Sequence, residues 1–234
     1  MAPRRPSNLH PLTEELLDRL KDHPEASEIV IGGGVALSHY SEHRDTFDLD
    51  AWWKSQPKSE TIELVRAAMK QIACLHGSAF EENQRGDVIR FNIKEVSGQK
   101  VFSFQIARRD QYLDRPITSL WDPVLLETFP ENVASKMVAL VDRGAPRDFV
   151  DIYEIVIRDL ISLEQCWDLY LQKRQDADLE AAKQQVLEHL ERIEARRPLD
   201  SITDPEDRSY AESVRSWYYE HFGNTEDIND GARL

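Results

Sequence analysis

Apolar side chains recur at spacings that predict alternating helices and strands over the first half of the chain. A helix is expected at residues 12–20, where three leucines share one face and Thr13 is placed to act as the N-cap. A second helix is expected at residues 59–75, where the helical period is clear. The other elements are short strands at residues 27–31, 46–53, 88–96 and 100–106, and a short helix at 35–40.

The second half of the chain is predicted to be helical. Gly144 stands where a helix C-terminus favours glycine, and Pro146 stands where the first turn of the next helix favours proline. Helices are expected at residues 131–142, 147–160, from 163 onward, at 179–197 and at 210–222. The pattern therefore predicts an α+β fold, with a small mixed-sheet core at residues 1–120 followed by a helical domain at residues 121–234.

Charge limits the kinds of partner that the chain can bind. Its 234 residues include 43 acidic and 29 basic side chains, which gives a formal net charge of −14. This balance disfavours indiscriminate nucleic-acid binding, which depends on counterion release by Lys and Arg. An RNA could still bind a local basic patch, for which the candidates are Arg85, Arg90, Lys94, Lys100, Arg108 and Arg109. Taken alone, these residues are better explained as the solvated side of a hairpin.

The sequence has no feature of a membrane or secreted protein. No apolar run approaches the roughly 20 residues needed to cross a bilayer, and the N-terminus lacks the apolar segment of a secretory signal. Cys74 and Cys166 have no partners at metal-ligand spacing and are expected to be buried thiols. These features predict a cytoplasmic protein.

Three consecutive glycines, Gly32, Gly33 and Gly34, separate the first predicted strand from a helical segment. Glycine lets the backbone come close to an anion, and the N–H groups at the start of the next helix favour a phosphate. The alternative is an ordinary tight turn, which is the commoner use of such a sequence. The spacing fits neither the G-x-G-x-x-G of dinucleotide-binding folds nor a P-loop, since no Lys-Ser or Lys-Thr pair follows.

The second chemical signal is the pair Asp48 and Asp50 in a predicted strand. Side chains two apart on a strand point to the same face, so these carboxylates should lie side by side while Phe47, Leu49 and Ala51 turn to the buried face. Adjacent carboxylates repel each other unless a cation intervenes, and Mg²⁺ binds one or two carboxylates while keeping positions for substrate phosphates. The alternative is an exposed strand edge with two solvated aspartates.

The residues around these two signals resemble a known family. The string Gly-Gly-x-Ala-Leu, followed by Arg-x-Thr-x-Asp-x-Asp, is similar to the signature of the AbiEii/AbiGii toxin-type nucleotidyltransferases, within the polymerase-β-like nucleotidyltransferase superfamily. A second block resembles that family's Lys-x-x-Ala-Leu-x-x-Arg and (Lys/Arg)-Asp-x-x-Asp-(Leu/Ile)-Tyr motifs. The residues that carry the resemblance are Gly33, Gly34, Arg44, Thr46, Asp48, Asp50, Lys136, Arg143, Asp148 and Asp151.

The second block also has a physical interpretation of its own. Lys136 and Arg143 share one face of a predicted helix, where their charges could meet a triphosphate. Asp148 falls in the first turn of the next helix, where the helix dipole stabilises an acid. The alternative is a helix-capping and salt-bridge cluster that joins the two helices. Because the first block is also present, we expect Lys136 to bind phosphate. We expect Asp148 or Asp151 to orient Lys136 or a metal-bound water.

The resemblance implies a nucleotidyltransferase core at residues 1–120 that moves a nucleoside monophosphate from an NTP, with Mg²⁺ or Mn²⁺ as cofactor. It implies a bacterial abortive-infection or type IV toxin–antitoxin role, an RNA (such as a tRNA 3′ end) or protein acceptor, and a cognate antitoxin as partner. Asp48 and Asp50 would bind the metal. The other implied catalytic residues are Lys136, Asp148 and Asp151, and the implied nucleotide-binding residues are Gly33, Gly34, Arg44, Thr46, Lys136 and Arg143.

One departure concerns the third carboxylate that many superfamily members carry on a later strand. In the run at 101–106 the aromatic residues should face the core, which leaves Ser103 and Gln105 on the other face, and neither is a carboxylate. Asp110 follows a few residues later and is a candidate substitute. Phosphoryl transfer without that base is feasible, because positioning and charge neutralisation contribute most of the catalysis. The alternative function is a catalytically weakened nucleotidyltransferase fold that binds a nucleotide or a partner.

Overall fold

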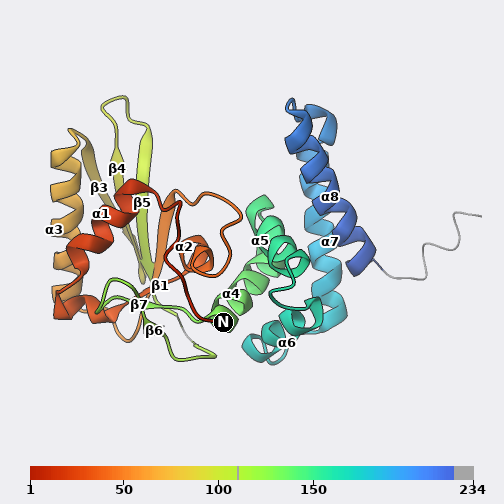
Figure 1. The fold of residues 1–234 in the computed structure, drawn as a ribbon, viewed down its shortest axis with the longest axis horizontal. Helices are drawn as coiled ribbons and strands as arrows, with labels where there is room; N and C mark the ends of the chain where they lie inside the picture. The colour runs from red at the N-terminus through yellow and green to blue at the C-terminus, as the bar shows by residue number, and fades with distance from the viewer. Residues whose placement is uncertain (110, 224–234) are drawn as a thin grey trace, which may run out of the picture. The chain divides into compact units, whose positions relative to one another are not determined.

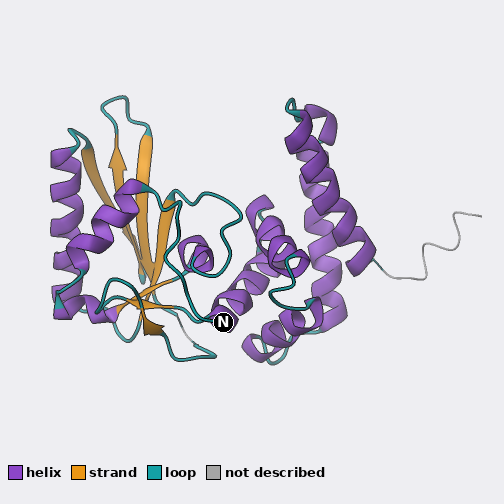
Figure 2. Ribbon diagram, viewed as in Figure 1, coloured by secondary structure: helices purple, strands orange, loops and turns teal. Residues whose placement is uncertain are grey.

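The computed structural model describes residues 1–109 and 111–223. The chain divides into two compact units, Met1–Asn132 and Val133–Leu234. The described strands all belong to the first unit, and the described part of the second unit consists of helices and their connections (Figure 2). A division into two domains after residue 120 stays a prediction.

The first unit is built on a seven-stranded mixed sheet with the order β3-β4-β5-β2-β1-β7-β6 (Figure 1). β2 pairs in parallel with β5 and β1 pairs in parallel with β7, whereas the other neighbours are antiparallel. The strand that carries the two aspartates, β2, therefore lies between β5 and the strand that leads into the glycines, β1. The strands are β1 (Ile29–Ile31), β2 (Asp48–Trp53), β3 (Ala79–Arg85), β4 (Val88–Lys94), β5 (Lys100–Ala107), β6 (Ile117–Thr118) and β7 (Leu125–Leu126).

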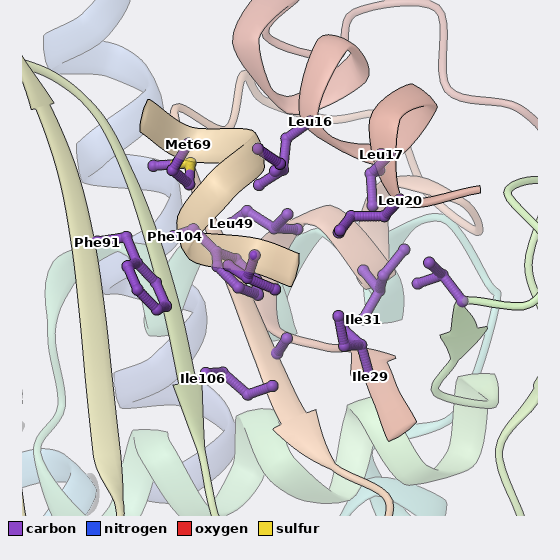
Figure 3. Close-up of a cluster of buried hydrophobic side chains, with 14 of the residues drawn as sticks. Leu16, Leu17, Leu20, Ile29, Ile31, Leu49, Met69, Phe91, Phe104 and Ile106 are labelled. Carbon is purple, nitrogen blue, oxygen red and sulfur yellow. The ribbon is translucent and has the colours of Figure 1, made fainter. Parts of the chain in front are cut away.

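Helices α1 and α3 cover one face of this sheet and enclose the main hydrophobic core (Figure 3). Three leucines of α1 and Met69 of α3 belong to the same core as Leu49, Phe91 and Phe104 of the sheet, and each of these residues is at most 1% exposed. The three leucines are Leu16, Leu17 and Leu20. Full burial of one such side chain contributes about 1.5–3 kcal/mol to stability. The helical segments of the first unit are α1 (Pro11–Leu20), the 3-10 turn η1 (Pro24–Glu28), α2 (Gly33–Ser38) and α3 (Ser59–Leu75).

The second unit packs its helices around aromatic side chains. The rings of Phe149 and Tyr218 lie 4.7 Å apart, and the buried Tyr218 hydroxyl donates to the Phe149 carbonyl at 2.9 Å. The described helices include none that is both long and apolar enough to cross a membrane. The helical segments are α4 (Phe129–Asp142), which begins in the first unit, α5 (Pro146–Ile157), α6 (Leu163–Lys173), α7 (Leu179–Arg196), η2 (Leu199–Ser201) and α8 (Pro205–Phe222).

The predicted α+β class is confirmed, with its mixed sheet and its helical C-terminal half. Three strands were missed. The residues of β3 are largely polar and half-buried or exposed, so the strand shows no apolar alternation and is defined by its pairing with β4. The two-residue strands β6 and β7 are too short to show a period.

Three local expectations were wrong. The N-cap of α1 is His10, whose ring accepts a hydrogen bond from the Leu12 N–H at 3.3 Å, whereas Thr13 is buried in the first turn. Phe47 precedes β2 and is 64% exposed, so the strand alternation does not extend to it. Cys166 is buried as expected, but Cys74 is exposed.

Candidate functional site

Asp48 and Asp50 lie on one face of β2, and both are half-buried. Leu49 and Ala51 alternate with them on the opposite face and are only 1% exposed, within the hydrophobic core. The predicted placement of the two carboxylates on the same face is therefore confirmed. Metal binding by these carboxylates stays a prediction.

The glycine turn lies directly against the strand that carries these aspartates. The Gly32 N–H donates to the Asp50 carbonyl at 2.9 Å. Gly33 has a φ of +59°, and a Cβ at this residue would lie 2.7 Å from Asp50 Oδ2. A Cβ at Gly32 would lie 2.1 Å from Trp52 Nε1. Glycine is thus required here both by backbone conformation and by close approach to the strand.

Gly34 is constrained by the loop that leads into β2. A Cβ at Gly34 would lie 3.0 Å from Thr46 Oγ1 and 3.1 Å from Arg44 Nη2. Arg44 Nη1 in turn lies 3.4 Å from Thr46 Oγ1. The structure therefore brings four predicted nucleotide-binding residues together at the glycine turn, with Gly33 directly against Asp50: Gly33, Gly34, Arg44 and Thr46.

Asp48 has a cationic partner that the sequence did not reveal. Lys100 Nζ lies 3.0 Å from both carboxylate oxygens of Asp48. The two side chains are 46% and 38% exposed, so solvent screens the pair and it contributes at most about 1 kcal/mol. The ring of His10 lies close enough to respond to the same carboxylate: burial lowers the His10 pKa, and the Asp48 charge opposes that shift.

The two carboxylates are a donor set that fits Mg²⁺. The described residues include no group of three or more His, Cys, Asp or Glu side chains gathered at metal-binding distances. A structural Zn²⁺ site would need four protein ligands and a catalytic one three. Mg²⁺ takes one or two carboxylates and keeps water and substrate phosphates in its remaining positions. Asp48 and Asp50 are the residues that would hold such an ion.

The strand beside β2 carries no third carboxylate at the expected positions. Ser103 and Gln105 pair in register with Asp48 and Asp50, while Phe104 between them is fully buried in the core. Gln105 Oε1 accepts a hydrogen bond from Arg90 Nε at 3.2 Å and a second from Arg90 Nη2. Asp110, the candidate substitute, lies outside the described residues.

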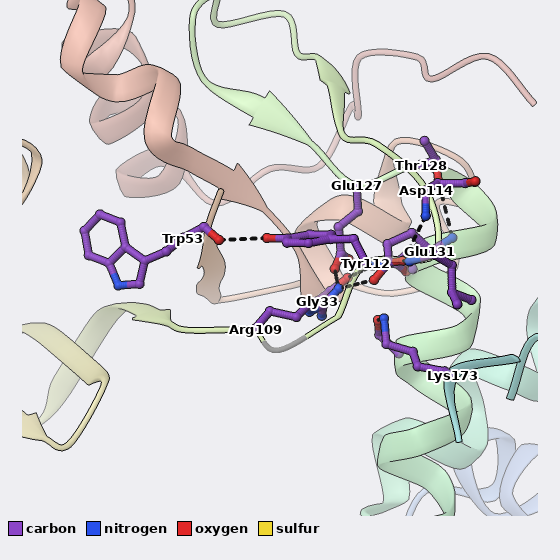
Figure 4. A network of polar contacts seen from close by, with 12 residues as sticks. Gly33, Trp53, Arg109, Tyr112, Asp114, Glu127, Thr128, Glu131 and Lys173 are labelled. Atoms are coloured by element: carbon purple, nitrogen blue, oxygen red, sulfur yellow. Dashed lines mark hydrogen bonds and ion pairs between the residues drawn. The ribbon is translucent and has the colours of Figure 1, made fainter. Parts of the chain in front are cut away.

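A buried ion-pair network lies next to the glycine turn (Figure 4). Arg109 Nη1 bridges the carboxylates of Glu127 and Glu131, and these three side chains are 8%, 0% and 1% exposed. The guanidinium carbon of Arg109 also lies 4.0 Å from the centroid of the Trp52 ring, at a cation–π distance. Arg109 was a candidate for a basic patch or for the solvated side of a hairpin, and its burial contradicts both expectations.

Asn132 connects this network to the glycine turn. Its Nδ2 donates to the Gly33 carbonyl at 3.1 Å and to Glu127 Oε2 at 2.7 Å. The turn is therefore held from two sides, by Asn132 and by the Trp52 indole against Gly32. Sequence reasoning missed Glu127, Glu131 and Asn132, because no local pattern marks contacts over such long separations.

The second sequence block forms two ion pairs within the second unit. Lys136 Nζ lies 2.7 Å from Asp151 Oδ2, and both side chains are buried. Arg143 contacts Asp148 with two nitrogens, at 2.8 and 2.9 Å, and Asp148 also accepts the Ala145 N–H at 3.2 Å. Asp151 is thus the carboxylate that contacts Lys136, and both pairs fit the helix-capping and salt-bridge alternative. A role of Asp148 or Asp151 in orienting Lys136 or a metal-bound water stays a prediction. Nucleotide binding by Lys136 and Arg143 stays a prediction.

Comparisons with known proteins give one assignment. No curated protein matches the sequence. Two crystal structures from Helicobacter pylori overlap with the chain. JHP933 is 16% identical in sequence, with a TM-score of 0.49, and the match covers 95% of both chains. The second, described provisionally as a nucleotidyltransferase, is 15% identical, with a TM-score of 0.49, and the match covers 93% of this chain and 94% of the other. Overlap at this level assigns no function. The profile of the AbiEii nucleotidyl transferase toxins matches residues 15–220. The chain therefore belongs to the AbiEii nucleotidyl transferase toxin family of type IV toxin–antitoxin systems.

Proposed function

We propose that this chain transfers a nucleoside monophosphate from an NTP to an acceptor in the cytoplasm, as the toxin of a bacterial type IV toxin–antitoxin pair. The observation that carries the proposal is the approach of the glycine turn to the aspartate strand, where only a missing Cβ at Gly33 leaves room for Asp50 Oδ2. A triphosphate lying on the backbone of this turn would be next to Asp50 and Asp48. Family membership supports the same reaction class.

In this proposal Asp48 and Asp50 hold a divalent cation, Mg²⁺ or Mn²⁺. The cation would neutralise phosphate charge and orient the reacting oxygens. The backbone at Gly33 admits the phosphates, and the Thr46 hydroxyl and the Arg44 guanidinium supply donors to them. The acceptor hydroxyl attacks the α-phosphorus and releases its proton to water. The bond between the α-phosphorus and the oxygen that bridges it to the β-phosphate breaks, and pyrophosphate leaves.

Lys136 and Arg143 are proposed to bind nucleotide as well, because they belong to the sequence block that resembles the family's second motif. Asp151 would hold the Lys136 ammonium in place, since Lys136 Nζ and Asp151 Oδ2 already lie 2.7 Å apart. Asp148 would fix the guanidinium plane of Arg143.

A second candidate function is a nucleotide- or partner-binding module with weak or no turnover. The amide of Gln105 beside Asp50 favours it, because an amide cannot accept the proton of the attacking hydroxyl. Lys100 on Asp48 favours it too, because this pair would have to open for a cation to bind.

Label placement separates the two candidates. Purified full-length chain is incubated with Mg²⁺, total RNA and cell protein, and with each NTP labelled at either the α- or the γ-phosphate. If the chain is a transferase, the α-phosphate label should appear in an acceptor that either RNase or protease digests, and the γ-phosphate label should not. Transfer should be lost when Mg²⁺ is chelated and in the Asp48→Asn variant. Nucleotide binding without transfer to any acceptor would support the module.

The toxin role has its own test. Expression of the wild-type chain should arrest bacterial growth, and co-expression of its cognate antitoxin should restore it. Asp48→Asn should not arrest growth. Equal toxicity of the two chains would reject a toxin that acts by nucleotidyl transfer.

A further inference from the structure

Asp50 of β2 is aligned across the sheet with one residue on each of the next two strands, β5 and β4. Asp50 pairs in register with Gln105 of β5, and Gln105 pairs with Arg90 of β4. Neighbouring strands lie ~4.8 Å apart, so the Arg90 backbone stands about 10 Å from that of Asp50. The glycine turn approaches Asp50 from β1, on the other side of β2. A nucleotide on the turn and the Arg90 side chain therefore lie on opposite sides of Asp50.

Arg90 is an exposed cation held by a neutral group. Two of its five N–H donors go to Gln105 Oε1, from Nε and from Nη2. Among the residues that the structure describes, no carboxylate lies within ion-pair distance of Arg90. Its remaining donors and its full charge are available to an anion. Gln105 fixes the guanidinium without neutralising it.

Other cations of the same strands are already neutralised. Lys94 lies 2.5 Å from a carboxylate oxygen of Glu81, and Lys100 lies 3.0 Å from both oxygens of Asp48. Arg90 thus differs from both lysines in keeping an uncompensated charge beside the candidate metal site. The overall charge of −14 makes such an uncompensated cation informative, because it disfavours diffuse attraction of a polyanion to the chain.

We infer that Arg90, positioned by Gln105, binds a backbone phosphate of an RNA acceptor whose terminal hydroxyl reacts at Asp48 and Asp50. The inference rests on the proposed function and names RNA as its acceptor class. The planar fork of a guanidinium matches two phosphate oxygens. A nucleic-acid end carries phosphates inward of its reacting hydroxyl, whereas a protein side chain carries none.

Binding of RNA to the full-length chain tests this without relying on turnover. A single-stranded RNA labelled at its 5′ end is titrated by fluorescence anisotropy with a chelator present and NTP absent, over a series of salt concentrations. Arg90→Gln should weaken binding about tenfold, since it loses a charge-assisted contact, and should lower the slope of log K against log salt by about 0.7. Arg90→Lys should keep the slope but recover only part of the affinity.

Two further variants assign the effect to this position. Arg85→Gln removes the same charge from an exposed residue of the neighbouring strand β3, and should change the affinity by less than about threefold. Gln105→Ala removes the positioning amide and should weaken binding while leaving the salt slope unchanged. Thermal melting checks that each variant is folded, as expected for strand residues that are exposed (Arg85, Arg90) or half-buried (Gln105).

Each contrary result has a distinct meaning. Equal losses in Arg85→Gln and Arg90→Gln would indicate general charge attraction and overturn the inference, as would unchanged binding in Arg90→Gln. Failure of the wild-type chain to bind RNA, with α-label transferred to protein, would overturn it and leave nucleotidyl transfer standing. Arg90-dependent RNA binding without transfer to any acceptor would support the phosphate contact and reject the proposed reaction.

Discussion

Gly33 is the residue at which backbone conformation and candidate chemistry meet. Its φ of +59° already disfavours other residues, and a Cβ would lie 2.7 Å from Asp50 Oδ2 and 2.9 Å from Asp50 Cβ. We predict that Gly33→Ala displaces the Asp50 carboxylate and lowers the rate of nucleotidyl transfer at least about tenfold. It should also lower the free energy of unfolding by about 1–3 kcal/mol. Label transfer and urea unfolding measure the two effects.

Gly98→Ala is the matched control, because Gly98 has a φ of +85° but a Cβ there would meet nothing within 4 Å. The control should lose about 1–2 kcal/mol of stability from backbone strain alone and keep its transfer rate. A comparable loss of transfer in both variants would mean that the effect of Gly33→Ala does not come from contact of the new Cβ with Asp50.

Arg109 is the residue on which the buried network depends. Arg109→Met would leave the carboxylates of Glu127 and Glu131 buried without their cation, and should lower the free energy of unfolding by about 3–5 kcal/mol. Arg174→Met breaks an ion pair with Asp142 whose side chains are 49% and 51% exposed, and should cost less than about 1 kcal/mol. Equal small losses in urea unfolding would show that the network is not structural.

At the scale of elements, helix α2 makes the fold sensitive to acid through His39 at its C-terminus. Burial lowers the His39 pKa from its ordinary 6.5, against the opposing hydrogen bond to the Val35 carbonyl and the charge of Glu42. The unfolded chain therefore binds a proton more readily than the folded chain. The stability that neutral His39 contributes is present above pH 6.5 and is lost as the pH falls through that value toward the folded pKa.

We therefore predict a lower free energy of unfolding at mildly acidic than at neutral pH. Within the described residues His39 Nε2 is buried without a hydrogen-bond partner, so a proton added there would be desolvated. Urea unfolding across this range should show the decline in the wild-type chain and a smaller decline in His39→Leu. A pH dependence that the substitution leaves unchanged would assign the effect to other groups, such as His10, whose pKa burial also lowers.

Helices α4 and α5 are joined by the buried pair of Lys136 and Asp151. Lys136→Met should destabilise the chain by about 3–5 kcal/mol, because Asp151 would be left charged in the interior. Combining it with Asp151→Leu should restore most of the stability, since an apolar pair can replace a buried ion pair. If Lys136 also binds nucleotide, neither variant will transfer label. Transfer by the double variant would reduce Lys136 to a structural role.

At the scale of the whole molecule, the sequence predicts elements that carry their own signal. The leucine face of α1, the helical period of α3 and the turn between β4 and β5 are each defined by residues close together in the sequence. Each is found where expected. β3 gave no signal, because its polar residues pair with β4 without entering the core. The network beside the glycine turn joins residues up to 99 positions apart, so only the folded chain reveals it.

The candidate site also has one part that the sequence predicts and one part that only the folded chain reveals. The shared face of Asp48 and Asp50 follows from the two-residue period of a strand, and the sequence predicts it. The contact of Lys100 with Asp48, and that of Arg90 with Gln105, depend on which strands are neighbours and in what register. Residue spacing along one strand cannot supply that information.

The central claim, that the half-buried carboxylate against the glycine turn is essential for nucleotidyl transfer, is tested most directly by two single-atom changes. Asp50→Asn and Asp87→Asn each replace one carboxylate by an amide, the first beside Gly33 and the second at an exposed turn. Transfer of α-label from NTP with Mg²⁺ should fall by about a hundredfold or more in Asp50→Asn and stay at the wild-type rate in Asp87→Asn. Undiminished transfer by folded Asp50→Asn would contradict the account.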